Sequence, residues 1–313
     1  MVRRKSFLRL LPPLGGAALF LALPQAAREG VLAGLRLSGT VLAPALFPVS
    51  VLAGCLLQMG GFGGGGRVWR RFARGLGLPM AGGTPLLLGL LGGFPLGAQL
   101  TAQACESGTL SRQEAPRLAG LSCSAGPAFL LGTLGGLFGS QGFGAVLLGL
   151  QLVSVVVTAL LTRGRGPASA EPPPLERGPQ AAFWTCLPEA IGRSAGAMVR
   201  LTGAVCFFQA ATRCAGALVS PALLPTPVQA ALAGALELTG GMELLSGCDP
   251  WEALPLAAAL VGWGGLCVHL QAAQALSAAG LPLRPYLRIK ALQSAVCLVL
   301  GVFFLFFKKT VGF

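Results

Sequence analysis

The polar side chains that could do chemistry in this chain are few, and most of them stand within apolar runs. Glu237 lies between Leu236 and Leu238, and a carboxylate at the centre of a bilayer costs about 2.5–3.5 kcal/mol on insertion scales. We therefore expect Glu237 to be paired, protonated or functional. His269, the single histidine, could take a proton or bind a solute, or it could pack with its N–H bonded to a backbone carbonyl. We predict a site for a small polar solute or an ion, lined by Gln99, Thr101, Gln103, Ser122, Ser124, Glu237, Thr239, His269, Gln271 and Gln274.

Other chemistries find no support in the sequence. The serines have no histidine or aspartate partners at a useful spacing, so nucleophilic catalysis is not expected. One histidine cannot form a histidine-based metal cluster, and the 9 cysteines include no CxxC pair, which argues against a zinc site or a disulfide framework. The glycine-rich stretch 60–66 lacks the GK[ST] ending of a phosphate loop. We expect no enzyme activity, no metal and no cofactor.

The composition predicts an all-α polytopic membrane protein, with the lipid bilayer as its main partner. Hydrophobic residues make up 54% of 313 residues, charged residues 11%, and the mean hydropathy is +0.73, whereas a soluble domain carries roughly 25% charged residues. The net charge of +13 would suggest nucleic acid in a soluble protein. Here the basic residues fall in short connections, as expected for cytoplasmic loops, so no nucleic acid is expected.

The candidate site residues lie at or near breaks in the apolar runs. Glycine and proline interrupt helices, because glycine costs about 1 kcal/mol relative to alanine and proline lacks a backbone donor. In a bilayer such breaks survive where they are buried in protein or line a cavity. The helix-break residues are Gly92, Gly93, Phe94, Pro95, Gly97, Gly126, Pro127, Gly240, Gly241, Gly262, Gly264 and Gly265.

The order of these elements repeats, which predicts two inverted-topology repeats with two re-entrant hairpins and two broken transmembrane helices. The predicted spans and hairpins of residues 31–162 are 31–59, 84–105, 118–138 and 143–161, and those of residues 181–307 are 195–219, 228–247, 251–275 and 291–307. Residues 181–193 could lie along the interface. The cytoplasmic side collects 16 of 23 basic residues: Arg3, Arg4, Lys5, Arg9, Arg67, Arg70, Arg71, Arg74, Arg112, Arg117, Arg163, Arg165, Arg177, Arg284, Arg288 and Lys290.

The remaining segments flank or join the two repeats. Residues 1–30 are predicted to form an N-terminal helix resembling a signal anchor, although Ala22 to Ala26 could also pass for a signal-peptidase site. Residues 163–180 are rich in proline and are expected to form a cytoplasmic linker, and residues 308–313 a basic tail. Small residues such as Gly89 and Gly93 permit close helix contacts within one chain or in a homo-oligomer.

Four motifs in this order resemble the sporulation integral membrane protein YlbJ family, which belongs to the Gate (nucleoside-recognition) superfamily. They are GGFPLGAQ at 92–99, SCSAGPAFLLGTLG at 122–135, LELTGG at 236–241 and GWGGLCVHLQ at 262–271. The resemblance implies a bacterial membrane protein with a transporter-like body and a role in forming the spore cortex or envelope, in the mother-cell or forespore membrane. One departure is that Cys123, Ser124 and Ala125 stand where the family usually has asparagines and a serine.

Two functions follow as hypotheses. The first is a transporter or permease of a small polar solute, with its site at the paired breaks and with Glu237 and His269 binding the solute or coupling protons. The second is a non-transporting scaffold that recruits spore-envelope assembly proteins. If the scaffold hypothesis is right, changes in the linker or the basic loops abolish function. If the transporter hypothesis is right, changes at the helix breaks abolish function.

Overall fold

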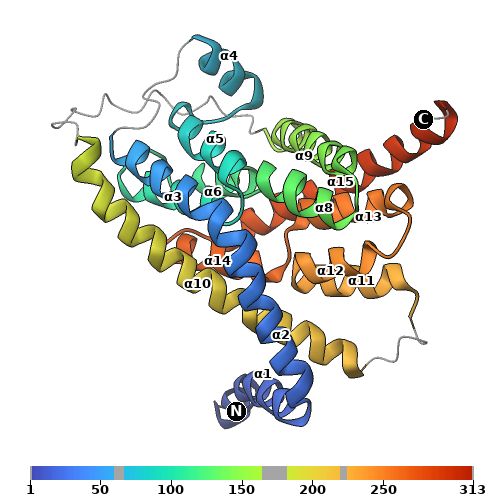
Figure 1. Cartoon of the computed structure of the whole chain (residues 1–313). Coiled ribbons are helices and arrows are strands. Elements are labelled where there is room, and N and C mark those ends of the chain that lie inside the picture. Colours follow the sequence, from blue (N-terminus) through green and yellow to red (C-terminus); the bar gives the residue numbers. More distant parts are fainter. Residues whose placement is uncertain (1, 60–66, 164–181, 219–223, 312–313) are drawn as a thin grey trace.

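The computed structural model describes residues 2–59, 67–163, 182–218 and 224–311, and within these ranges every regular element is helical (Figure 1). Four helical segments are long and apolar enough to cross a membrane: Pro24–Leu56, Gln141–Leu161, Pro250–Ala278 and Leu283–Val311. The helix pair Arg67–Leu76 and Met80–Gly92 passes the same test together, although it is bent by 104°. The predicted all-α membrane class is therefore confirmed. The predicted crossing at 195–219 is not among these candidates, and Arg200 and Gln209 stand in its middle.

The chain begins with two helical runs that part at Leu23. Helix α1 (Val2–Ala22) is followed by α2 (Pro24–Leu37), the π-turn η1 (Ser38–Leu42) and α3 (Ala43–Gln58). Pro24 opens α2, where its missing N–H is no loss because it stands at the first position of the helix. The N–H of Ala43 bonds to the carbonyl of Ser38, five residues back, directly before Pro44, which cannot donate. The helix therefore has one wider turn directly before Pro44.

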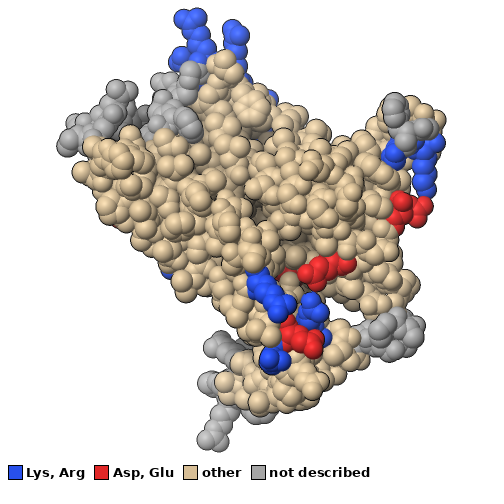
Figure 2. All heavy atoms as spheres, in the orientation of Figure 1, with Lys and Arg blue, Asp and Glu red and all other residues tan. Residues whose placement is uncertain are grey.

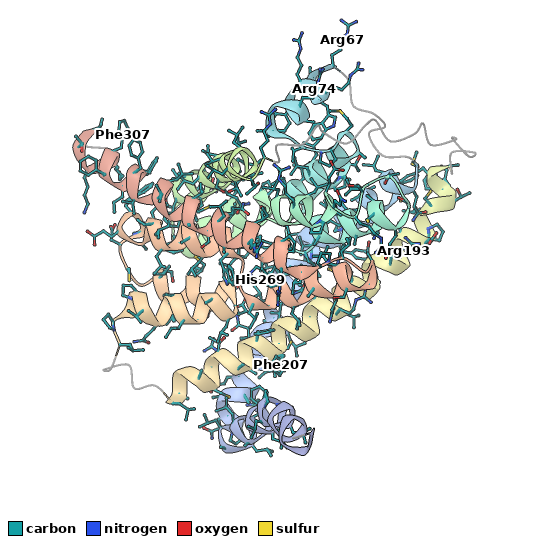
Figure 3. The ribbon with its side chains drawn as sticks, turned by 180° about the vertical axis from the view of Figure 1, so that it is seen from behind. Arg67, Arg74, Arg193, Phe207, His269 and Phe307 are labelled. Carbon is teal, nitrogen blue, oxygen red and sulfur yellow. The ribbon has the colours of Figure 1, made fainter. Side chains whose placement is uncertain are left out.

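The basic segment after residue 66 is a helix rather than the predicted loop. Helix α4 (Arg67–Leu76) buries Ala73 and Leu76, and the indole N–H of Trp69 donates to the carbonyl of Met80 at 2.8 Å. Basic side chains of α4 project from one end of the molecule (Figures 2 and 3). Between this end and the charged side chains near the opposite end, the face seen in Figure 2 is a broad surface without charged side chains, as expected for a protein surrounded by lipid.

The first half of the chain continues with a helix hairpin and an interrupted helix. After the short turn η2 (Met80–Gly82), α5 (Gly83–Gly92) and α6 (Leu96–Glu106) pack against each other. Helix α7 (Ala115–Ser122) is separated from η3 (Ala128–Leu134) and α8 (Gly135–Leu137) by residues 123–127, and α9 (Gln141–Leu161) follows. Before α7, the hydroxyl of Ser111 donates to the carboxylate of Glu114 at 2.7 Å and accepts from the backbone N–H of Glu114 at 3.3 Å.

The second half has the same order of elements. The long helix α10 (Phe183–Leu218) precedes the hairpin of α11 (Thr226–Leu236) and α12 (Leu238–Leu245), the interrupted helix α13 (Pro250–Trp263) with α14 (Leu266–Ala278), and α15 (Leu283–Val311). Two expectations are corrected here. Residues 183–193 are the start of α10 rather than a separate interfacial segment, and Lys308 and Lys309 lie within α15 rather than in a separate tail. The predicted linker at 163–180 falls almost wholly outside the described residues.

The two largest apolar clusters of the core share Phe94. One cluster joins α5, α6 and α7 to α9, α14 and α15, and the other joins η3, α8 and α9 to α11, α12, α13 and α15. Phe94, in the turn between α5 and α6, packs against both. The bend of the first hairpin therefore sits where the two halves of the chain meet.

Arg117 has a structural role that its place among the basic loops did not suggest. It is half-buried, and its guanidinium donates to the carbonyls of Leu76 at 3.0 Å and Ala159 at 2.7 Å, to the carbonyl of Gly77, and to the hydroxyl of Thr162 at 3.1 Å. These acceptors lie at the C-terminal ends of α4 and α9, where carbonyls lack partners within the helix. Arg117 thus ties α7 to both helix ends.

We expect Arg117→Lys to lower the free energy of unfolding by about 2 kcal/mol, because an ammonium cannot reproduce the planar set of guanidinium donors. The loss is measured as a lower unfolding temperature of the purified protein in detergent. The control is Arg112→Lys: Arg112 is exposed and makes one bond, at 3.3 Å, to the carbonyl of Gly280. Equal losses in both variants would show that the bonds of Arg117 to the two helix ends do not matter.

Candidate functional site

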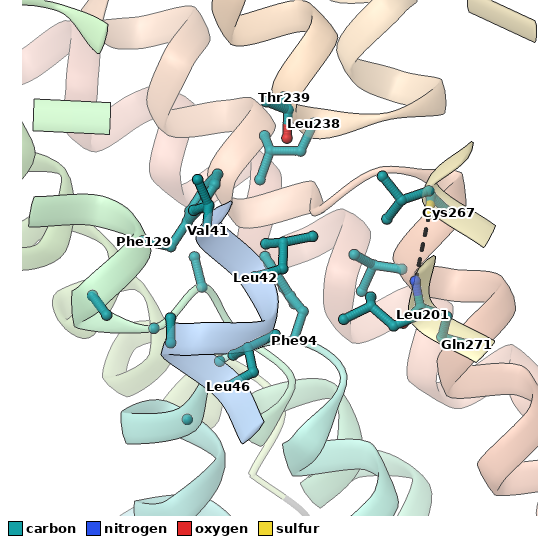
Figure 4. A pocket seen from close by; sticks show the side chains of 18 of the residues that line it. Val41, Leu42, Leu46, Phe94, Phe129, Leu201, Leu238, Thr239, Cys267 and Gln271 are labelled. Carbon is teal, nitrogen blue, oxygen red and sulfur yellow. Dashed lines mark hydrogen bonds between the residues drawn. The ribbon is translucent and has the colours of Figure 1, made fainter. Parts of the chain in front are cut away.

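Three of the four predicted breaks, together with the helix that follows the fourth, line one cavity of about 110 Å³ (Figure 4). The first break supplies Gly92, Gly93 and Phe94, the second Ala125 and Gly126, the third Glu237, Leu238 and Thr239, and the start of α14 after the fourth break Cys267, Val268 and Gln271. The π-turn η1 and helices α3 and α10 close the sides with apolar residues such as Leu42, Leu46 and Leu201. Segments far apart in the sequence therefore meet at one place, as the repeated pattern of breaks predicted.

The backbone at these breaks explains why the sequence places glycines there. Gly93 has φ of 80°, and Gly264 and Gly265 have φ of 90° and 87°, values that side-chain-bearing residues adopt rarely. A Cβ on Gly264 would lie 3.0 Å from the ring of Phe94. The positive φ angles let the chain turn sharply between half-helices, and the missing side chains let the first and fourth breaks approach each other.

Glu237 is the residue that separates α11 from α12. Its backbone is extended, and its side chain caps α12: Oε1 accepts from the N–H of Thr239 at 3.1 Å and Oε2 from the N–H of Gly240 at 2.8 Å. Oε2 also accepts from Nε2 of Gln209 on α10, at 2.7 Å. The buried carboxyl group is thus held by three donors at a helix N-terminus, where the helix dipole favours negative charge. It serves as a structural cap and also lines the cavity.

Gln271 offers the cavity an acceptor that has no partner within the described part of the chain. Its Nε2 donates to Sγ of Cys267 at 3.5 Å (Figure 4), while its Oε1 is buried and unbonded. An unsatisfied buried acceptor costs about 1–3 kcal/mol unless something binds it. With Glu237 and Thr239, Gln271 gives a largely apolar cavity its polar side chains.

The predicted hydroxyl residues lie near the cavity but bond to protein groups. Thr101 donates to the carbonyl of Gly97 at 2.7 Å and stands 3.4 Å from the hydroxyl of Ser122. Ser124 donates to the carbonyl of Leu121 at 3.3 Å and accepts from Gln293 at 3.2 Å. All three hydroxyl groups are buried, and none belongs to the cavity lining. They hold α6, α7 and α15 together around the second break.

His269 is deep in the molecule (Figure 3), on α14, but it faces α15 rather than the cavity. Its Nδ1 lies 3.1 Å from the hydroxyl of Tyr286, and its ring packs edge-on against Trp263 with centroids 4.2 Å apart. Its Nε2 has no hydrogen-bond partner among the described residues. The structure thus places this histidine in a buried cluster beside the cavity.

The three remaining predicted residues do not line the main cavity. Gln99 and Gln103 on α6 line a smaller cavity of about 40 Å³, together with Arg193 of α10. Gln274 on α14 is exposed. The ten candidates therefore do not form one site: Glu237, Thr239 and Gln271 share the main cavity, and the others divide between its supports, the second cavity and the surface.

Lys290 was assigned to the cytoplasmic basic residues, and this is wrong. It lies on α15 with 0% exposure, and its Nζ donates to the carbonyl of Cys123 at 2.8 Å. Sequence reasoning missed it because Arg284 and Arg288 precede it in an apparently basic loop. The spacing of Tyr286, Lys290, Gln293 and Cys297 could have revealed it, since positions i, i+4 and i+7 share one face of a helix.

Together, the spans and the cavity define a multi-pass integral membrane protein whose interrupted helices meet around a central pocket. The chain is similar to the sporulation integral membrane protein YlbJ of Bacillus subtilis (strain 168), with 26% identity over 316 residues that cover 88% of this chain and 77% of that protein. The resemblance drawn from the four motifs is confirmed by this relative. No family model and no solved structure matches the chain.

Proposed function

We propose that the chain is a permease for a small solute in the membrane of a spore-forming bacterium, acting in sporulation like the relative whose name records that process. The observation that supports a permease is the convergence of three helix breaks and the start of α14, which follows the fourth, on one cavity. Secondary transporters place their substrates where discontinuous helices meet, because half-helix ends and unwound backbone offer hydrogen bonds there. The repeated order of elements supports an inverted-topology repeat, with the hairpins α5–α6 and α11–α12 as re-entrant segments.

The cavity lining narrows the class of solute. Most of its residues are aliphatic or aromatic, and the polar side chains that reach it include two with acceptor oxygens, Glu237 and Gln271. The bonds of Glu237 are directed to α12 and Gln209, whereas Oε1 of Gln271 has none in the described ranges. We therefore infer a solute with an apolar body and at least one N–H or O–H donor, of which nucleosides and amino acids with apolar side chains are examples.

The test is a ligand screen by heat stability of the purified protein in detergent. A bound solute stabilises by RT ln(1 + [L]/Kd), about 2.7 kcal/mol at a hundredfold excess over Kd, so a panel of nucleosides, amino acids, small dicarboxylates and metal ions is compared. We expect a selective shift with a donor-bearing compound. No shift with any compound in a well-folded sample would favour a scaffold that recruits spore-envelope proteins.

Gln271→Leu separates binding from folding. Because the substitution removes an unbonded buried acceptor, we expect an unfolding temperature equal to or slightly above that of the wild type without ligand, and loss of the ligand shift. Gln274→Leu is the matched control on the same helix: it lies outside the cavity lining and should keep the shift. A full ligand shift in Gln271→Leu would contradict a site in this cavity.

A further inference from the structure

A lysine side chain is wholly buried beside the second helix break. Nζ of Lys290 donates to the backbone carbonyl of Cys123 at 2.8 Å and to Oε1 of Gln293 at 2.8 Å. It also lies 5.5 Å from the centre of the Phe94 ring, within the range of a cation–π contact. None of the ion pairs found among the described residues includes Lys290. The ammonium is therefore held by neutral dipoles and an aromatic face.

The carbonyl of Cys123 is a group suited to a cation. Cys123 follows the last residue of α7, and its backbone leaves the helical conformation there. Carbonyls at the C-terminal end of a helix lack partners within the helix and carry partial negative charge. In discontinuous membrane helices, such ends and the unwound carbonyls beside them coordinate monovalent cations.

The side chain of Gln293 is also oriented to hold a cation. Its Nε2 lies 3.2 Å from the hydroxyl of Ser124 and 3.4 Å from the hydroxyl of Ser154, and the whole residue has 0% exposure. With its amide N–H groups directed at these hydroxyls, its oxygen faces Nζ of Lys290. The ammonium thus contacts two oxygen atoms, one at the end of α7 and one on α15, and the second is held in place by the hydroxyls of Ser124 and Ser154.

We propose that the second helix break is a binding site for a monovalent cation, and that the ammonium of Lys290 is its resident, tethered occupant. In this position the lysine supplies the positive charge that a free Na⁺ or K⁺ would otherwise bring. It also joins the bend of the first hairpin, through Phe94, to the end of α7. This inference goes beyond solute transport and holds whether or not the main cavity binds a solute.

The test removes the lysine side chain from the site and measures whether free cations then stabilise the protein. The unfolding temperature of the purified full chain in detergent is compared in chloride salts of choline, sodium, potassium, methylammonium and ethylammonium at equal ionic strength. Lys290→Ala should unfold at a lower temperature than the wild type in choline. At least one small cation should raise the unfolding temperature of this variant by roughly 2 °C, the shift expected at about tenfold excess over Kd for a chain of this length. The wild type should unfold at the same temperature in every salt, because its site is filled.

Two variants control for general salt effects. Lys309→Ala changes an exposed lysine of α15 and should respond to the salts as the wild type does. Lys290→Met fills the space with an apolar chain and should gain nothing from small cations. Should Lys290→Ala not fold, Lys290→Gln, which leaves room for an ion, carries the same expectation. The proposal is overturned by a wild type that Na⁺ stabilises relative to choline, by equal unfolding temperatures of the emptied variant in all salts, or by an equal gain in Lys290→Met.

Discussion

Gly97→Ala should unfold the protein or lower its free energy of unfolding by about 3 kcal/mol or more, the upper range for overpacking a buried contact. Gly97 lies in the first turn of α6, and a Cβ at this position would overlap the carbonyl group of Ser122 at the end of α7. The obstacle is backbone rather than a flexible side chain, so it cannot rotate away. Separation of α6 from α7 would also disturb the contact at 3.4 Å between the hydroxyl groups of Thr101 and Ser122.

The measurement is the yield of monodisperse protein in detergent and its unfolding temperature. The matched control is Gly149→Ala on α9, where an added Cβ would meet no atom within 4 Å. Alanine is favoured over glycine in a helix by about 1 kcal/mol, so this control should be as stable as the wild type or slightly more stable. A Gly97→Ala variant with wild-type stability would mean that the first hairpin and α7 are not in contact as described.

Glu237→Ala should lower the free energy of unfolding by about 3 kcal/mol. The substitution removes the cap of α12, worth about 0.5–2 kcal/mol. It also leaves Nε2 of Gln209 and the N–H groups of Thr239 and Gly240 without the acceptors they use, and a buried unsatisfied donor costs about 1–3 kcal/mol. Glu237→Gln should lose less, since its amide keeps one oxygen for two of these donors.

The measurement is the unfolding temperature in detergent. It should be highest for the wild type, lower for Glu237→Gln and lowest for Glu237→Ala. The matched control is Glu243→Ala, which removes an exposed carboxylate of α12 that lies 3.6 Å from Arg213. Exposed ion pairs contribute about 1 kcal/mol or less, so the control should change little. If Glu237→Ala and Glu243→Ala lost the same amount, the carboxyl group of Glu237 would not be the buried cap that its contacts describe.

The sequence by itself determined the class of protein and the places where its helices break. Long apolar runs with few charges specify membrane helices because each charge is costly in hydrocarbon. Gly93, Gly264 and Gly265 mark turns with positive φ, whereas the third break lies at Glu237, before the predicted pair Gly240 and Gly241, because the Glu237 side chain caps α12 and both glycines are helical. These are local properties of the backbone, so they can be recognised without knowing what packs around them. The repeated order of the elements follows from them.

Which polar residues face the cavity was decided only by the tertiary structure. Gln271 and Gln274 are three residues apart on α14, yet the first lines the cavity and the second is exposed. Lys290 follows two arginines in the sequence but is buried, because α15 packs against α7 and presents it to the carbonyl of Cys123. The rotation of α14 and α15 about their axes depends on their neighbours, since both helices are largely apolar and no continuous polar face fixes their orientation in advance. The sequence therefore supplied the breaks and the candidates, and packing between distant segments selected among them.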